Sequence, residues 1–207
     1  EEFPPYHMNY RVIDVTSSVV SASFGALMNS QQYRSRTLVP QIRLGDEKLD
    51  NFRFNQMGSA MSRFQGPSVA RLPLDEENNG DAVRQAIWDE VNNRYKFAVD
   101  MYQKTKAESS VNVEEEDKAP YFSEVKVEKY YEAPLPAEKM TIDMDQWAAR
   151  MKEISAVFKN QPGIMKGDAI MIYTVERRYF VNNEGTEVVQ NLPYARIMVF
   201  GETKADD

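Results

Sequence analysis

The sequence has no cysteine and a single histidine, His7, and these two shortages exclude several kinds of chemistry. Without cysteine there is neither a disulfide framework nor a thiolate nucleophile. A peptidase zinc generally needs three protein ligands, so one histidine excludes a two-histidine zinc helix within this chain. We interpret His7, which follows Pro4-Pro5-Tyr6, as a surface or packing residue.

Other catalytic patterns are missing as well. Gly163 and Gly167 lack the further glycines and the Lys-Ser/Thr pair of a phosphate-binding loop. The serines between Ser17 and Ser23 lack a strand-to-helix elbow, and His7 is the one histidine that could act as their base. Nothing selects a catalytic pair among the 32 acidic residues. We therefore predict no catalytic residue, no metal ligand and no cofactor site in this chain.

Long apolar runs and an excess of positive charge are also absent. No run approaches the roughly 20 apolar residues that span a bilayer, and no signal peptide is visible. The net charge of −7 argues against a broad contact with nucleic acid. We expect neither a membrane nor a nucleic-acid partner. A start at Glu1 instead of Met indicates processing or trimming, which leaves the compartment open: cell envelope or secretion after signal removal, otherwise the cytoplasm.

The composition is that of an ordinary globular protein, and period-two alternation predicts strands at the N-terminus. Residues 8–15 are β-prone, and apolar residues alternate from Val20 to Met28. Residues 34–44 repeat the pattern, but Pro40 interrupts it, so this segment is expected to be an edge strand or to carry a bulge. The first fifty residues are predicted to form a small antiparallel meander.

Two helices are predicted from apolar residues at spacings of three and four. The first begins at Asp81 and ends near Lys106. The second is capped by Asp143, with Gln146 as its capping-box partner, and ends at Gln161-Pro162-Gly163. Its expected buried stripe is Trp147, Met151, Ile154 and Phe158. Both stripes are expected to pack on a sheet.

Two segments do not show a regular pattern. Residues 51–71 form a long irregular segment rich in methionine and phenylalanine. Residues 109–120 carry four adjacent acids, Glu114-Glu115-Glu116-Asp117. Because consecutive acidic side chains point apart and repel each other, we expect a solvated acidic linker and no metal there.

The C-terminal third contains the strongest local signal. A β-rich run from Val175 to Val181, the cluster Asn182-Asn183-Glu184-Gly185 and a second β-rich run predict a hairpin whose turn needs glycine. Three strands are expected, over residues 169–181, 186–190 and 194–200. The fold class is therefore α+β: a mainly antiparallel sheet built from N- and C-terminal meanders, covered by two long helices. We expect one domain over residues 1–207.

The hairpin also carries a family resemblance. The segment Arg178-Tyr179-Phe180-Val181-Asn182-Asn183-Glu184-Gly185-Thr186, followed by Tyr194-Ala195-Arg196, resembles the "RYFVNSEGT … YAR" signature of the TldD/PmbA family. Members of this family are zinc-dependent peptidases once named modulators of DNA gyrase. Weaker matches occur in the same order along nearly the whole chain, among them Pro4-Pro5-Tyr6, Ala22-Ser23-Phe24-Gly25, Leu72-Pro73-Leu74-Asp75 and Lys204-Ala205-Asp206-Asp207.

The resemblance implies that this chain is the N-terminal domain of a larger protein. The family's His-Glu-x-x-x-His zinc motif lies in its C-terminal half and has no match here, so no catalytic or metal residue is carried over, and zinc would belong to the missing half. Family members form dimers around a chamber that admits extended peptides. The implied partners are the chain's own C-terminal domain, a second copy and an extended peptide.

Three arginines, Arg177, Arg178 and Arg196, are the candidates for contact with a peptide or partner. A peptide could add as a strand to an exposed edge of the C-terminal meander, and the arginines could hold its carboxylates. The alternative, which we favour, is that they pair across strands with neighbouring glutamates, namely Glu176, Glu184 and Glu187.

Two other functions fit the sequence. The chain could be a stand-alone binding or assembly module of the cell envelope that meets a partner through the Met- and Phe-rich segment 51–71. A carbohydrate-binding β module would use aromatic residues such as Tyr130, Tyr131 and Trp147, although Trp147 is expected in the core.

Overall fold

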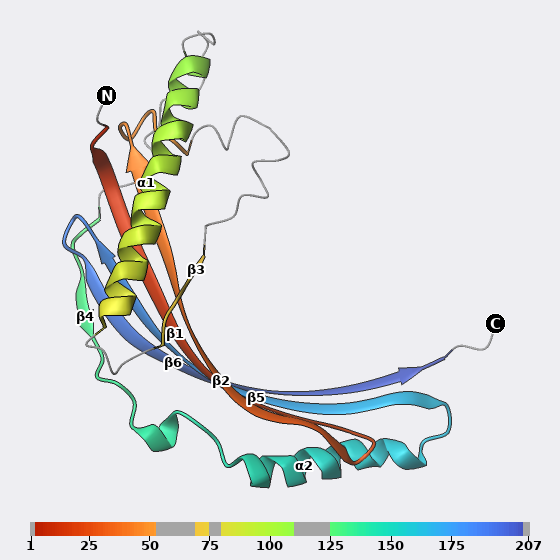
Figure 1. The fold of residues 1–207 in the computed structure, drawn as a ribbon. Helices are drawn as coiled ribbons and strands as arrows, with labels where there is room; N and C mark the ends of the chain where they lie inside the picture. The colour runs from red at the N-terminus through yellow and green to blue at the C-terminus, as the bar shows by residue number, and fades with distance from the viewer. Residues whose placement is uncertain (1–2, 53–68, 75–79, 110–124, 205–207) are drawn as a thin grey trace. The chain divides into compact units, whose positions relative to one another are not determined.

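Four long strands and two helices make up most of the chain in the computed structural model, which describes residues 3–52, 69–74, 80–109 and 125–204 (Figure 1). The strands are β1 (Pro5–Ser23), β2 (Ala26–Leu44), β3 (Ala70–Leu72), β4 (Lys129–Tyr131), β5 (Ile164–Asn182) and β6 (Glu187–Thr203). The helices are α1 (Asp81–Ser109) and α2 (Met144–Ala156), with short 3-10 helices η3 (Ala137–Lys139) and η4 (Val157–Asn160).

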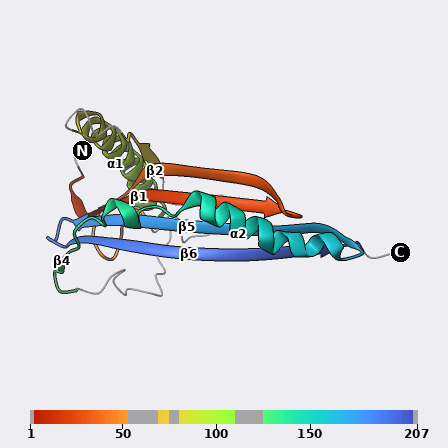
Figure 2. The same ribbon diagram turned by 90° about the horizontal axis from the view of Figure 1, so that it is seen from below.

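All six strands belong to one sheet in the order β3-β2-β1-β5-β6-β4. Strand β3 pairs antiparallel with residues 36–38 of β2, and β4 pairs parallel with residues 187–189 of β6. Figure 2 shows the four long strands side by side in this order. The predicted α+β class with a mainly antiparallel sheet is confirmed, and the N-terminal and C-terminal hairpins share one sheet through the adjacency of β1 and β5.

The N-terminal hairpin turns earlier than the sequence pattern predicts. We expected one strand from Val20 to Met28, but Phe24 and Gly25 form a turn between β1 and β2 with φ values of 45° and 77°. A two-residue turn with positive φ at both positions matches the twist of a hairpin. The apolar alternation continues across this turn, so alternation alone did not mark it.

The C-terminal hairpin has two strands where we predicted three. Residues 186–190 and 194–200 were expected to be separate, but β6 runs unbroken from Glu187 to Thr203. Pro193 lies inside it. Proline is tolerated in a strand where its nitrogen, which has no hydrogen to donate, faces an edge. The predicted second meander is therefore a single long hairpin.

The described residues form two compact units, and each contains one helix. Unit 1 comprises Glu1–Ile13, Arg36–Tyr131 and Arg178–Val189. Its core holds Ile42, Leu44 and Ala98, so α1 packs on the end of β2; Phe3, Met8, Val91, Tyr95, Val99 and Tyr102 surround them. The predicted first helix is confirmed. Its expected apolar stripe is Val83, Ile87, Val91, Tyr95, Ala98 and Tyr102, and the last four of these residues lie in or beside this core. The expectation of a single domain stays a prediction.

Unit 2 comprises Asp14–Ser35, Glu132–Arg177 and Gln190–Asp207. Helix α2 packs on β1 and β5 through a core of Val20, Ala22, Ala148, Met151, Ala169 and Met171. The Asp143 carboxylate accepts a hydrogen bond from the Gln146 backbone N–H at 2.9 Å, which confirms the predicted cap. Trp147 and Ile154 pack beside this core as predicted. Phe158 of η4 contacts Gly167, where an added Cβ would lie 2.4 Å from the Phe158 Cβ.

Two of the expected segments lie largely outside the described residues. The described part of the Met- and Phe-rich segment 51–71 is limited to residues 51–52 and 69–71, and the acidic run 114–117 of the predicted linker is not described. Among the described residues, none of the helices combines the length and apolar character needed to cross a bilayer.

We predict that Gly45→Ala destabilises unit 1 more than Gly163→Ala destabilises unit 2. Both glycines have positive φ, 102° and 85°, so each alanine costs about 1–2 kcal/mol in backbone conformation. A Cβ at Gly45 would also lie 2.3 Å from the Leu49 carbonyl oxygen, whereas one at Gly163 meets nothing within 4 Å. Urea unfolding of both variants measures the difference. Equal losses would contradict the close contact at Gly45.

Candidate interaction site on strand β6

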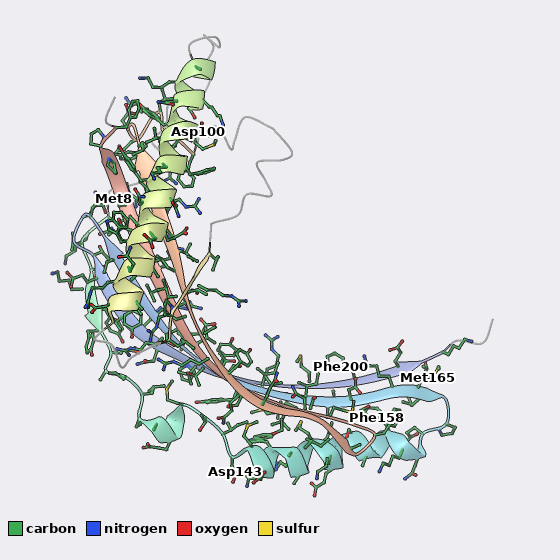
Figure 3. The ribbon with its side chains drawn as sticks, viewed as in Figure 1. Met8, Asp100, Asp143, Phe158, Met165 and Phe200 are labelled. Atoms are coloured by element: carbon green, nitrogen blue, oxygen red, sulfur yellow. The ribbon has the colours of Figure 1, made fainter. Side chains whose placement is uncertain are left out.

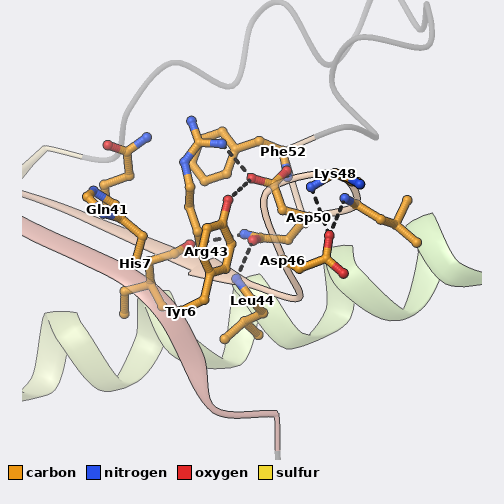
Figure 4. Close-up of polar contacts among 12 residues, drawn as sticks. Tyr6, His7, Gln41, Arg43, Leu44, Asp46, Lys48, Asp50 and Phe52 are labelled. Atoms are coloured by element: carbon orange, nitrogen blue, oxygen red, sulfur yellow. Dashed lines mark hydrogen bonds and ion pairs between the residues drawn. The ribbon is translucent and has the colours of Figure 1, made fainter. Parts of the chain in front are cut away.

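A dense polar cluster lies in unit 1 at the end of β2 (Figure 4). The Asp50 side chain is fully buried and forms an ion pair with Arg43. It also accepts a hydrogen bond from the Tyr6 hydroxyl at 2.9 Å and one from the Phe52 backbone N–H at 2.8 Å. The Arg43 guanidinium stacks over the Phe52 ring, 4.3 Å from its centre.

This cluster fixes the loop that follows β2. Asn51 continues the attachment: its side chain accepts from the Leu44 backbone N–H and donates to the Ile42 carbonyl. Burial, and then the hydrogen bond to the Asp50 carboxylate, raise the pKa of Tyr6 far above its ordinary value. A tyrosine held in its neutral form with a carboxylate as acceptor is suited to holding structure. We assign the cluster a structural role.

The tip of the β5–β6 hairpin is also bonded internally. The Asn183 side chain accepts from the Met8 backbone N–H at 2.9 Å and donates to the Tyr6 carbonyl, and Glu184 lies 3.4 Å from His7. Gly185 has a φ of 99° in the turn, as the sequence predicted. The most recognisable residues of the hairpin thus close its turn and attach it to β1.

Among the three candidate arginines, Arg177 has the best defined contacts. In unit 2 its guanidinium donates to the Asn191 side-chain oxygen at 2.7 Å and to the Glu132 carbonyl at 3.0 Å. The Glu132 carboxylate in turn accepts from the Asn191 backbone N–H at 2.6 Å. Asn191 and Glu132 were not predicted, because no local pattern brings residues 59 positions apart together.

Arg178 and Arg196 lie on different strands. Arg178 is an exposed residue of β5 in unit 1, and Arg196 is an exposed residue of β6 in unit 2. The structure does not bring the three arginines to one place. A role for them in contact with a peptide or partner stays a prediction.

The outer edge of β6 is open along most of its length. Among residues 3–52, 69–74, 80–109 and 125–204, no strand pairs with the side of β6 that faces away from β5 after Val189. In an antiparallel ladder, backbone N–H groups point alternately toward the neighbouring strand and away from it. The Glu187 N–H donates to the Glu128 carbonyl and the Asn191 N–H to the Glu132 carboxylate, so odd-numbered amides face away from β5.

The same alternation gives the direction of the backbone N–H groups along the rest of this edge. Pro193 occupies an outward position, where its lack of an N–H costs no pairing with β5. Beyond Pro193 the outward-facing residues are Ala195, Ile197, Val199, Gly201 and Thr203. This stretch therefore presents the backbone N–H and C=O groups of five residues, which can pair with another strand.

The open edge is also apolar on both sides. Ile197 and Val199 are 51% and 50% exposed, and Phe200 is 47% exposed. A Cβ at Gly201 would lie 3.1 Å from the Phe158 ring, so Gly201 faces η4 and the neighbouring Phe200 points to the opposite side of the sheet (Figure 3). An edge strand with one open side and exposed apolar residues on both faces is typical of a contact surface.

Unit 2 has a second open edge, on β2. Strand β3 covers β2 only at residues 36–38, so residues 26–35 of β2 have no outer partner strand within the described ranges. This edge carries the polar residues Ser30, Gln31 and Gln32 together with the exposed side chains of Leu27, Met28 and Tyr33. Strand β6 is open over the longer stretch, residues 190–203, and is therefore the first candidate for an interaction site.

The part of the chain that the structure describes contains no group of three or more histidine, aspartate or glutamate residues arranged to hold a metal ion. The described residues thus provide no set of ligands that fits a peptidase zinc.

Comparisons with known proteins give structural matches only. No model of a known protein family matches the sequence, and no curated protein matches it. A proposed modulator of DNA gyrase from Bacteroides thetaiotaomicron has 8% sequence identity and a TM-score of 0.50, covering 98% of this chain and 38% of its own. TldE from Thermococcus kodakarensis has 16% identity and a TM-score of 0.49, covering 96% of this chain and 37% of its own.

A third structure, a proposed modulator of a DNA gyrase from Thermotoga maritima, has 9% identity and a TM-score of 0.48, covering 97% of this chain and 37% of its own. At these sequence identities the matches show a shared fold and nothing more. This conclusion rests on the Bacteroides thetaiotaomicron structure, whose TM-score is 0.50. This chain spans less than two fifths of the length of each structure that it matches. Over nearly its whole length, the chain has the fold of one part of a modulator-of-DNA-gyrase protein, as the sequence resemblance to the TldD/PmbA family implied.

Proposed function

We propose that this chain acts as a non-catalytic N-terminal domain of a larger TldD/PmbA-like protein. In this role it helps to form the dimer, or the chamber through which extended peptides reach a zinc site in another part of the protein. The observation that supports this most is the structural match over 98% of this chain but only 38% of the Bacteroides thetaiotaomicron chain. A domain that makes up a fraction of its structural relatives has its natural partner in the remaining fraction.

The open edge of β6 supports an assembly role. It combines outward-facing backbone groups with the exposed side chains of Ile197, Val199 and Phe200. Strand addition at such an edge provides affinity through main-chain hydrogen bonds. The Asp50 cluster joins separate segments within unit 1, and the Arg177 network does so within unit 2.

Peptide hydrolysis tests the non-catalytic part of this proposal. We expect the 207-residue chain to cleave no unfolded protein or fluorogenic peptide, with or without added zinc. A zinc peptidase in the same buffer is the positive control, and His7→Ala removes the one imidazole of the chain. Zinc-dependent cleavage that a chelator stops and that His7→Ala abolishes would overturn the proposal.

A further inference from the structure

We propose that His7 is a proton-responsive residue that sets the orientation of two neighbouring side-chain amides, Asn9 and Gln41, and the strength with which the β5–β6 turn is attached to β1. Uptake of one proton by the imidazole reverses both amides together and strengthens the contact with Glu184. All four residues lie in unit 1. This inference goes beyond the proposed function and does not depend on it, because it concerns contacts within this chain alone.

The imidazole of His7 lies between a carboxylate and an amide. Its Nδ1 atom is 3.4 Å from a Glu184 carboxylate oxygen, and its Nε2 atom is 3.2 Å from the Asn9 side-chain nitrogen. In a neutral imidazole one nitrogen carries a hydrogen and the other accepts one. Because an ionised carboxylate only accepts and an amide nitrogen only donates, the hydrogen lies on Nδ1 and Nε2 accepts from Asn9. The two neighbours thus select one tautomer of His7.

The Asn9 amide extends this network to β2. The nitrogen that donates to His7 also donates to the Gln41 side-chain oxygen at 2.7 Å (His7 and Gln41 are labelled in Figure 4). Asn9 is only 5% exposed, so its polar atoms depend on protein partners rather than on water. The orientation of one amide therefore fixes that of the other.

A proton added to the ring reverses this arrangement. It can bind only at Nε2, because Nδ1 already carries a hydrogen, and Nε2 then faces the donating nitrogen of Asn9 as a second donor. The hydrogen bond is restored when the Asn9 amide turns over and presents its oxygen. That oxygen would also face the Gln41 oxygen, so the Gln41 amide must turn over as well and donate through its nitrogen. Each protonation state of His7 thus has its own fully bonded network.

The charged groups near His7, among the described residues, come from three elements. Glu184 of the β5–β6 turn is in direct contact with the ring and favours its charged form. Two cations lie on the neighbouring strands and oppose that form. Arg11 of β1 stacks over an aromatic ring, and Arg43 of β2 is paired with Asp50. The one group in contact with Nδ1 is therefore the one that a proton on the ring would attract.

The contact with Glu184 carries the effect to the β5–β6 turn. With a neutral ring, Nδ1 donates an ordinary hydrogen bond toward the carboxylate. With a charged ring the same contact becomes an ion pair, and hydrogen bonds between two charged groups are the stronger kind. The neighbouring Asn183 already holds the turn on β1 by accepting from the Met8 backbone N–H at 2.9 Å. Proton uptake by His7 therefore strengthens an attachment that exists in both states.

Nitrogen-15 NMR of the 207-residue chain tests the coupled amides, and its single histidine makes the ring signals unambiguous. At the neutral end of a titration, the hydrogen of the ring should be on Nδ1. Between about pH 8 and pH 5, the side-chain NH2 signals of Asn9 and Gln41 should shift with the same midpoint as the ring. The Gln85 side chain, which donates to Asp89 on the exposed surface of α1, is the control amide and should not follow.

Two substitutions distinguish coupled amides from two independent responses to charge. In Asn9→Ala, Gln41 loses its link to the ring, and its NH2 signals should no longer follow the titration. In Gln41→Ala, Asn9 keeps its contact with the ring and should still follow. Gln41 is more exposed than Asn9, so Gln41→Ala provides a test of the contact between Asn9 and the ring even if Asn9→Ala does not fold.

Hydrogen exchange tests the attachment of the turn. The reporter is the Met8 backbone N–H, which is bonded to the Asn183 side chain. Its protection, corrected for the intrinsic pH dependence of exchange, should rise about two- to fivefold when the ring gains its proton, the range that a partly exposed ion pair provides. Glu184→Gln keeps the shape of the side chain but removes its charge. In this variant the rise should be lost.

Four results would overturn the inference. They are a ring hydrogen on Nε2 at neutral pH, amide signals that do not follow the titration of the ring, a Gln41 amide that still follows it in Asn9→Ala, and Met8 protection that is unchanged by protonation of the ring. The peptide-hydrolysis test of the proposed function is a separate measurement, so failure of one is distinguishable from failure of the other.

Discussion

Asp50→Ala is expected to lower the free energy of unfolding by about 3–5 kcal/mol. The Asp50 side chain is fully buried and Arg43 is 11% exposed, so the substitution removes the carboxylate that faces a nearly buried guanidinium. The Tyr6 hydroxyl and the Phe52 N–H lose an acceptor in the same step. Urea unfolding followed by circular dichroism measures the loss.

Two further variants distinguish the contribution of this cluster to stability from that of the loop around it. Glu47→Ala changes an exposed acid of the same loop and should alter stability by no more than about 0.5 kcal/mol. Tyr6→Phe removes one donor, and combined with Asp50→Ala it should cost less than the sum of the single changes, because both remove the same hydrogen bond. Full additivity, or an Asp50→Ala chain as stable as Glu47→Ala, would show that the cluster does not hold unit 1.

Met151→Ala is the second substitution with a large expected effect. It should lower the free energy of unfolding by about 2–5 kcal/mol. Met151 is fully buried at the centre of the unit 2 core, between Val20 and Ala22 of β1 and Ala169 and Met171 of β5. Alanine removes the contacts of the long side chain and leaves a cavity between α2 and the sheet. Thermal and urea unfolding measure the loss.

The matched control is a methionine in the same unit. Met165 is 66% exposed, so Met165→Ala should change stability by no more than about 0.5 kcal/mol. Met151→Leu keeps a similar volume and should cost less than about 1.5 kcal/mol. If Met151→Ala and Met165→Ala behaved alike, α2 would not be held on the sheet by this core.

The two expected effects concern different units, and neither substitution touches the β6 edge. Asp50 lies in unit 1 and Met151 in unit 2.

The amino-acid sequence by itself determined the features that depend on neighbouring residues. The spacing of apolar residues predicts α1 and the buried face of α2, and Asp143 marks the start of α2 through a hydrogen bond to the third residue after it. The Asn-Asn-Glu-Gly cluster marks the β5–β6 turn, because only a few residue types accept the positive φ that Gly185 adopts. Each of these signals acts over one helical turn or one β-turn.

The tertiary structure alone decided which polar residues meet and which strand edge stays open. Asp50 meets Tyr6 across 44 positions, and Asn191 meets Glu132 across 59, distances over which no local pattern carries information. The sequence pattern predicted a break between residues 190 and 194, but Pro193 lies inside β6. A proline fits within a strand where its nitrogen faces the open edge, and which side is open depends on the neighbouring strands. The candidate interaction site is a property of pairing order, since a strand's edge is open or covered only by virtue of its neighbours in the sheet.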